Sequence, residues 1–157
     1  MKVTKRAAAI APSQTLEITA KAKKMKEAGI SVVSFGAGEP DFATPAPIVQ
    51  AAIDALHAGF TKYTPASGTD DLKKVVCEKL LRENGLRYEP CNIVISNGAK
   101  HSLFNIFQAT VEEGDEVIMP VPYWLTYPEL IRLAGGNPVF IETKAENDFK
   151  ITAEEFE

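Results

Sequence analysis

The stretch of sequence that decides the fold is residues 93–100, which read Ile93-Val94-Ile95-Ser96-Asn97-Gly98-Ala99-Lys100. Three β-branched apolar residues are followed by a turn of small residues and then by an apolar pattern at helical spacing, which predicts a strand, a tight turn and a helix. Such a turn leaves the first backbone N–H groups of the helix unpaired, with the positive end of the helix dipole behind them. The stretch therefore predicts a seat for a phosphate group. From local sequence alone, Gly98 and Ala99 also suit a turn that needs small residues only for packing.

An aromatic pair follows the second predicted strand, Glu116 to Met119. The chain continues there with Pro120-Val121-Pro122-Tyr123-Trp124. Open α/β sheets hold ligands beyond the carboxyl ends of their strands, so this aromatic surface is expected near the phosphate seat. An indole beside a phosphate seat indicates a phosphorylated aromatic cofactor, although Trp124 taken alone would equally suit a core or interface position.

Helical and strand patterns alternate along the rest of the chain, which favours an α/β fold with parallel strands. The predicted helices are residues 15–28, a helix that Thr44 caps with Pro45 in its first turn, a helix from Thr69 to Asn84-Gly85, and helices ending near residues 110 and 134. A third strand is predicted at 138–142, and the elements from Ile93 onward form two βαβ units. Thr152 is predicted to cap a further helix.

Composition limits the classes of function. The chain has 157 residues and a net charge of −4, which gives no basic footprint for nucleic acid. No apolar run is long enough to span a membrane. Two unpatterned cysteines favour a reducing compartment over a disulfide scaffold or metal site, so a cytoplasmic protein is expected. The two histidines, His57 and His101, are predicted to lie on helix surfaces or in caps.

Four motifs resemble one family when they are taken together. They are Gly36-Ala37-Gly38-Glu39-Pro40-Asp41-Phe42 with Thr44-Pro45, then Lys62-Tyr63, Ser96-Asn97-Gly98-Ala99-Lys100, and Pro122-Tyr123-Trp124. In this order they resemble the fold-type I, pyridoxal-phosphate-dependent class I aminotransferases, within them the bacterial aspartate aminotransferase branch. The resemblance implies a three-layer α/β/α fold with a mostly parallel sheet. It also implies a homodimer whose sites are shared across the interface.

The same resemblance implies that the fold is incomplete in this chain. Residues 1–44 are expected to form an arm and helix of the small domain, and residues 45–157 the first part of the large, cofactor-binding domain. In the family, the lysine that forms the Schiff base, the aspartate that pairs with the pyridine nitrogen and the arginine that binds the substrate α-carboxylate lie beyond the position of Glu157. The chain is therefore expected to hold no catalytic residue and to be inactive alone. The strand at Ile93 is expected to pair with a strand beyond Glu157.

Site residues follow from the resemblance, residue by residue. Those expected to bind pyridoxal 5'-phosphate are Gly98, Ala99 and Lys100 in the phosphate turn, Trp124 stacked on the pyridine ring, and the Tyr63 hydroxyl, which reaches the phosphate of the neighbouring subunit. Those expected to bind substrate are Gly38, Trp124, Lys100, Ser13 and Thr15. Lys100 is placed at the distal carboxylate of the substrate, not at the Schiff base.

The implied reaction is transamination of an amino acid with a 2-oxo acid, aspartate with 2-oxoglutarate. Ala11 departs from relatives that also accept prephenate, which carry a basic residue before the proline, so prephenate is not expected as a substrate. Two alternatives stay open. One is a lyase or synthase that uses the same cofactor and fold. The other is a truncated, non-catalytic chain that binds a partner or a full-length homologue.

Overall fold

The computed structural model describes residues 2–156, which form two compact units. One unit combines residues 2–14 with residues 97–156, and the other spans residues 15–96.

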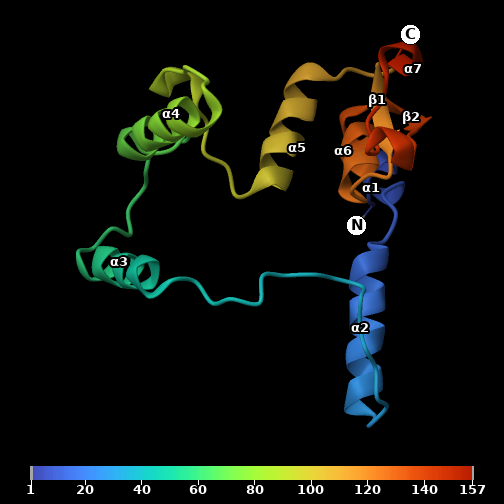
Figure 1. The fold of residues 1–157 in the computed structure, drawn as a ribbon, viewed down its shortest axis with the longest axis horizontal. Helices are drawn as coiled ribbons and strands as arrows, with labels where there is room; N and C mark the ends of the chain where they lie inside the picture. Colours follow the sequence, from blue (N-terminus) through green and yellow to red (C-terminus); the bar gives the residue numbers. More distant parts are fainter. Residues whose placement is uncertain (1, 157) are drawn as a thin grey trace. The chain divides into compact units, whose positions relative to one another are not determined.

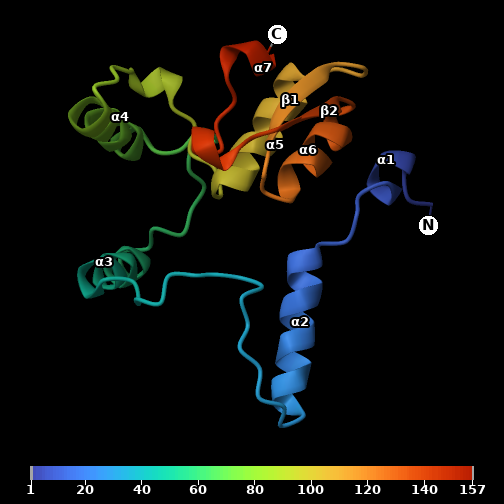
Figure 2. The same ribbon diagram turned by 45° about the vertical axis from the view of Figure 1, so that its right-hand side comes forward.

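A single βαβ unit forms the centre of the first unit. Strands β1 (Glu116–Val121) and β2 (Asn137–Glu142) pair in parallel, with Glu116 opposite Asn137 and Val121 opposite Glu142. Helix α6 (Thr126–Ala134) connects them and contacts β2, and helix α5 (Ala99–Thr110) packs against α6 (Figures 1 and 2). Met119 of β1 and Ile131 of α6 are the buried large hydrophobic residues of the part described. The sheet and α6 therefore enclose a small core.

Short elements complete this unit at both ends of its sequence. Helix α1 (Lys5–Ala8) contacts α6, and η2 (Ala145–Asn147) follows the sheet. Helix α7 (Ala153–Phe156) begins with reciprocal hydrogen bonds. The Glu155 N–H donates to Thr152 Oγ1 over 3.3 Å, and the Thr152 N–H donates to Glu155 Oε2 over 2.9 Å. This pattern is a capping box, so the predicted Thr152 cap is confirmed.

The second unit is built from helices without a sheet. Its elements are α2 (Gln14–Glu27), whose first residue belongs to the other unit, and then α3 (Ala46–His57), α4 (Asp70–Asn84) and η1 (Pro90–Asn92). The predicted caps of α4 are confirmed: Thr69 Oγ1 accepts from the Leu72 N–H over 3.4 Å, and Gly85 ends the helix at φ +67°. Both signals are local, which is why the sequence reveals them.

Two expectations are wrong. Thr44 does not cap α3, because the helix begins at Ala46 and Pro45 is its N-cap. The Pro45 carbonyl accepts a hydrogen bond from the Ile48 N–H over 2.9 Å, which closes the first turn. The proline of the first turn is Pro47. Residues 93–95 are also no strand, so the first of the two predicted βαβ units lacks its opening strand. A strand needs a partner strand, and the backbone hydrogen bonds of this extended segment go from the Ile93 N–H to the Pro90 carbonyl of η1 and from the Ile95 N–H to the Ser67 carbonyl in a turn.

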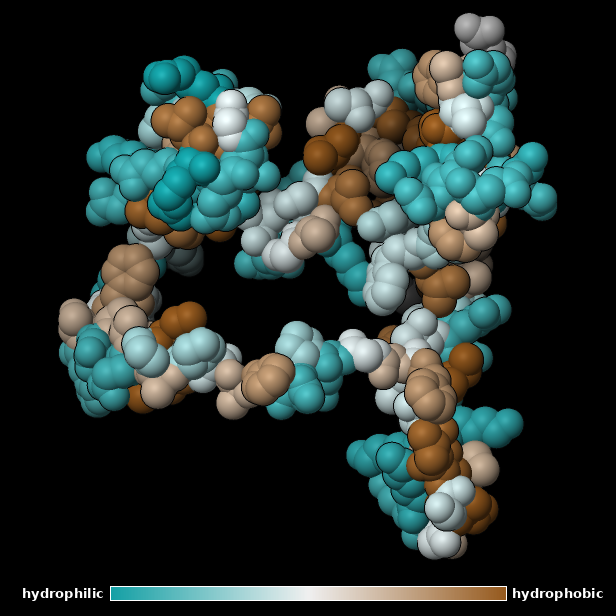
Figure 3. All heavy atoms as spheres, viewed as in Figure 1, coloured by the Kyte–Doolittle hydropathy of each residue, from teal (hydrophilic) through white to brown (hydrophobic). Residues whose placement is uncertain are grey.

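Large apolar side chains lie at the surface of both units. Helix α3 exposes Ile48 and Leu56 to 60% and 63%, and α2 exposes Leu16. Figure 3 shows brown, apolar surface over α2 and the segment that follows it. Such faces are typical of helices that pack against further protein. Among residues 2–156, no helix combines the length and the apolar character needed to cross a bilayer.

Candidate cofactor and substrate site

The turn before α5 exposes unpaired backbone donors. Gly98 has φ +83° and ψ 171°, a combination that is essentially restricted to glycine. Its carbonyl accepts from the His101 and Ser102 N–H groups over 3.1 and 3.3 Å, which closes the first turn of the helix. The Ala99 and Lys100 N–H groups precede these donors and bond to no other described residue. The helix therefore presents two free N–H groups at its positive end.

His101 supports the same turn from within the helix. The Asn97 N–H donates to His101 Nδ1 over 3.1 Å, so the imidazole accepts a hydrogen bond that would otherwise be lost at the turn. His101 is a capping residue, as predicted, and His57 lies exposed in the last turn of α3.

A cavity of about 340 Å³ opens beside this turn. Its lining combines polar and aromatic residues: Asn97, Gly98, Ala99, Lys100, Leu103, Trp124 and Tyr127. The Lys100 ammonium lies 5.5 Å from the centre of the Trp124 ring, within cation–π range. Trp124 itself is 54% exposed, so the indole has a free face. The structure thus brings together four of the predicted site residues, Gly98, Ala99, Lys100 and Trp124.

Contacts of the neighbouring residues hold the segment that carries Trp124 in place. The Tyr123 ring stacks on Phe140 of β2 with 5.2 Å between ring centres and 29° between planes. The Trp124 carbonyl accepts from the Tyr127 N–H over 3.0 Å and so leads directly into α6. The indole therefore projects from a packed element at the carboxyl end of β1, where α/β sheets place their ligands.

These residues fit a phosphorylated aromatic ring. A phosphate near pH 7 carries nearly two negative charges and accepts from several donors. Two free N–H groups and the helix dipole supply donors and positive potential for the phosphate, and the exposed Trp124 face supplies a surface for stacking.

A second cavity, of about 430 Å³, adjoins the same segment. One wall is residues 10–14, which include Ser13, and the other is the start of α6 with Glu129 and Arg132. The sequence does reveal that Glu129 and Arg132 are spaced i, i+3 on a helix, which is typical of an ion pair. It does not reveal that this pair faces the amino-terminal segment.

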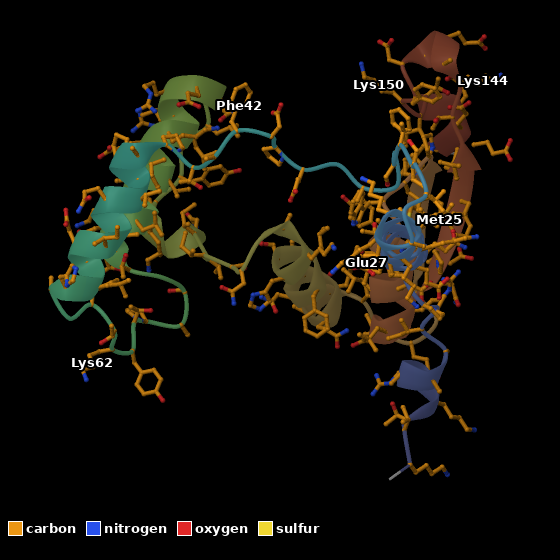
Figure 4. The ribbon with its side chains drawn as sticks, turned by 90° about the horizontal axis from the view of Figure 1, so that it is seen from below. Met25, Glu27, Phe42, Lys62, Lys144 and Lys150 are labelled. Carbon is orange, nitrogen blue, oxygen red and sulfur yellow. The ribbon has the colours of Figure 1, made fainter. Side chains whose placement is uncertain are left out.

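Tyr63, Gly38 and Thr15 belong to the unit of residues 15–96, and their predicted roles stay predictions. Tyr63 is fully exposed, and Figure 4 shows the preceding Lys62 projecting from the same loop. A Cβ on Gly38 would meet no atom within 4 Å, so a ligand has room to approach its backbone.

Comparison with known proteins identifies the family. Residues 30–157 match the family model described as aminotransferase class I and II. The chain is 55% identical over 146 residues to an aspartate aminotransferase of Bacillus sp. (strain YM-2), covering 93% of this chain and 37% of that enzyme. It is 49% identical over 157 residues to an aspartate/prephenate aminotransferase of Nitrosomonas europaea, covering 100% of this chain and 40% of that enzyme.

Comparison with solved structures identifies the same family. The Rhizobium meliloti aspartate aminotransferase superposes with a TM-score of 0.93 at 46% identity, covering 99% of this chain and 39% of that one. The Thermus thermophilus enzyme with maleate gives a TM-score of 0.94 at 42% identity, covering 99% and 41%. The predicted fold type is confirmed, and the chain spans about two fifths of the length of these relatives. The chain belongs to the class I and II aminotransferase family.

Proposed function

We propose that this chain supplies the phosphate seat, the stacking surface and the carboxylate-selecting lysine of an aspartate aminotransferase. The observation that carries the proposal is the cavity in which two free N–H groups, an ammonium and an exposed indole meet. Its relatives of similar sequence are named as enzymes that act on aspartate, some of them also on prephenate.

Class I aminotransferases use pyridoxal 5'-phosphate, and the residues of the cavity fit that group. When bound, it carries the amino group between substrates and delocalises the negative charge that develops as the α-proton leaves. The Ala99 and Lys100 N–H groups hold the phosphate at the start of α5. The helix terminus contributes about 0.3–1 kcal/mol to each such charge interaction.

Trp124 fixes the plane of the cofactor ring. An offset-stacked aromatic pair contributes about 0.5–1.5 kcal/mol beyond the burial of its area. Because Tyr123 and Phe140 hold the segment in place, the indole limits the tilt of the ring without any chemical step of its own.

Lys100 selects substrates with a second carboxylate. Its ammonium lies over the Trp124 ring in the cofactor cavity, and it is proposed to meet the distal carboxylate of the substrate there. An ammonium–carboxylate pair favours aspartate and glutamate, and their 2-oxo acids, over amino acids with apolar side chains. Ser13, in the adjoining cavity, and Thr15 are proposed to assist with their hydroxyls.

The proposal also covers the oligomeric state, the domain division and the cellular location of the whole protein. The exposed Tyr63 suits a hydroxyl that reaches a neighbouring subunit, so a homodimer is proposed. The domain division near Thr44 and a cytoplasmic location are proposed on the family resemblance. No residue of this chain is assigned a proton-transfer role.

The test is transamination by a full-length enzyme that contains residues 1–157. We expect conversion of aspartate and 2-oxoglutarate to oxaloacetate and glutamate, and a Lys100→Ala variant that loses dicarboxylate substrates selectively. Lys150→Ala, which removes a lysine that is 77% exposed, is the matched control. Equal loss for every amino donor would contradict the role of Lys100. Product formation without a 2-oxo acid acceptor would indicate a lyase instead.

A further inference from the structure

One side chain joins the amino-terminal segment to helix α6. Glu129 Oε2 accepts a hydrogen bond from the Ala11 N–H over 3.3 Å, although 118 residues separate the two positions in sequence. Glu129 Oε1 accepts from Arg132 Nη1 over 2.7 Å. The Glu129 side chain is 19% exposed. Both carboxylate oxygens are thus engaged at the edge of the second cavity.

We propose that Glu129 is a positioning residue for substrate selection: it anchors residues 10–14 and thereby sets where the Ser13 hydroxyl lies. This inference rests on the proposed function, in which Ser13 assists Lys100. Two residues of extended chain span at most about 7 Å, so an anchor at Ala11 confines Ser13 to a small region. Ser13 lines the same cavity as Glu129.

The wall to which the segment is anchored also carries the cofactor surface. Along residues 123–128, Trp124 and Tyr127 line the cofactor cavity, whereas Leu125 and Thr126 line the second cavity. The two cavities therefore share one wall. Because Glu129 holds residues 10–14 against this wall, it limits how far Ser13 can move relative to Trp124.

Arg132 makes Glu129 suitable for this task. Its guanidinium pairs with one carboxylate oxygen, which fixes the side-chain conformation and leaves the other oxygen for the Ala11 N–H. Helix α1 also contacts α6, so the segment has a second attachment. Loss of Glu129 is therefore expected to loosen residues 10–14 without releasing them.

The experiment uses a full-length enzyme that contains this chain and compares Glu129→Ala with the wild type. Hydrogen exchange of the peptide that contains Ala11 should become faster. The kcat/KM for aspartate should fall about 2- to 10-fold, which corresponds to the loss of one hydrogen bond. The kcat/KM for alanine should stay the same. Glu83→Ala, which removes a carboxylate from an ion pair on α4, is the matched control and should change neither quantity.

A double-mutant cycle separates positioning from a structural role. In a Ser13→Ala background, Glu129→Ala should cause no further loss of aspartate selectivity, because the hydroxyl that it positions is already gone. Additive losses, equal losses for aspartate and alanine, or unchanged exchange at Ala11 would each overturn the proposal. If Glu129→Ala does not fold, Glu129→Gln, which keeps one acceptor oxygen, should show a smaller selective loss in the same direction. A wild-type enzyme without aspartate activity would contradict the proposed function, and the exchange measurement would still decide whether Glu129 anchors Ala11.

Discussion

The contact between Gly68 and Ile95 gives the most quantitative prediction. It lies where the loop that follows Tyr63 meets the segment that leads into the phosphate turn. The Ile95 N–H donates to the Ser67 carbonyl over 3.0 Å, and the Gly68 backbone has φ +100°. A Cβ placed on Gly68 would lie 2.8 Å from Ile95 Cβ and closer still to Ile95 Cγ1. Real Cβ atoms do not approach so closely, so a Gly68→Ala variant has to move one of the two segments.

The expected cost has two parts. An alanine at positive φ costs about 1–2 kcal/mol. Overpacking a close contact costs about 1–3 kcal/mol. Gly68→Ala should therefore lower the free energy of unfolding by about 2–5 kcal/mol.

The assay is urea unfolding of a full-length enzyme that contains this chain, followed by circular dichroism. Gly59→Ala is the matched control, because Gly59 has φ +78° and a Cβ there would meet no atom within 4 Å. In the control, the free energy of unfolding should fall only by the cost of an alanine at positive φ, about 1–2 kcal/mol. Shortening Ile95 to alanine in the Gly68→Ala background should recover part of the difference. Equal losses of unfolding free energy for Gly68→Ala and Gly59→Ala would show that the contact with Ile95 adds no strain, which would contradict this prediction.

Three further predictions concern the cofactor surface, a helix cap and an exposed carboxylate. Trp124→Ala should weaken cofactor binding, measured by equilibrium dialysis, by about 2- to 13-fold through lost stacking alone, whereas Trp124→Phe should retain most of it. Thr69→Ala should lower the unfolding free energy by about 1 kcal/mol, because the Leu72 N–H loses its acceptor, and Thr69→Ser should not. The hydrogen bond from Arg82, helped by Lys79, holds the pKa of Glu83 below its usual value. The stability that this interaction gives is present above the pKa of Glu83 in the unfolded chain and is lost as pH falls through its pKa in the folded protein. Arg82→Ala should therefore raise the pKa of Glu83, measured by NMR titration.

The parts of the fold that the sequence predicts well rest on local signals. Thr69 and Gly85 bound α4 because a cap needs only the residues beside it. The prediction for Thr44 was wrong because several nearby residues suit the start of a helix. Only the structure shows that α3 begins one residue later than expected, with Pro45 and not Thr44 at the N-cap.

The parts that the sequence predicts poorly depend on distant partners. Residues 93–95 have the composition of a strand, yet a strand exists only where another lies beside it. The phosphate turn was predictable because Gly98 and the donors after it are neighbours in sequence. The bond between Glu129 and Ala11 was not, because no pattern within either segment refers to the other.

The start of α5 and Trp124 are proposed to hold the cofactor together. The most direct test is a crystal structure of a full-length enzyme containing this chain, grown with pyridoxal 5'-phosphate. We expect phosphate oxygens within about 2.7–3.2 Å of the Ala99 and Lys100 backbone nitrogens, with the pyridine ring stacked on Trp124. A phosphate bound away from residues 97–100, or a ring that does not face the indole, would contradict this proposal.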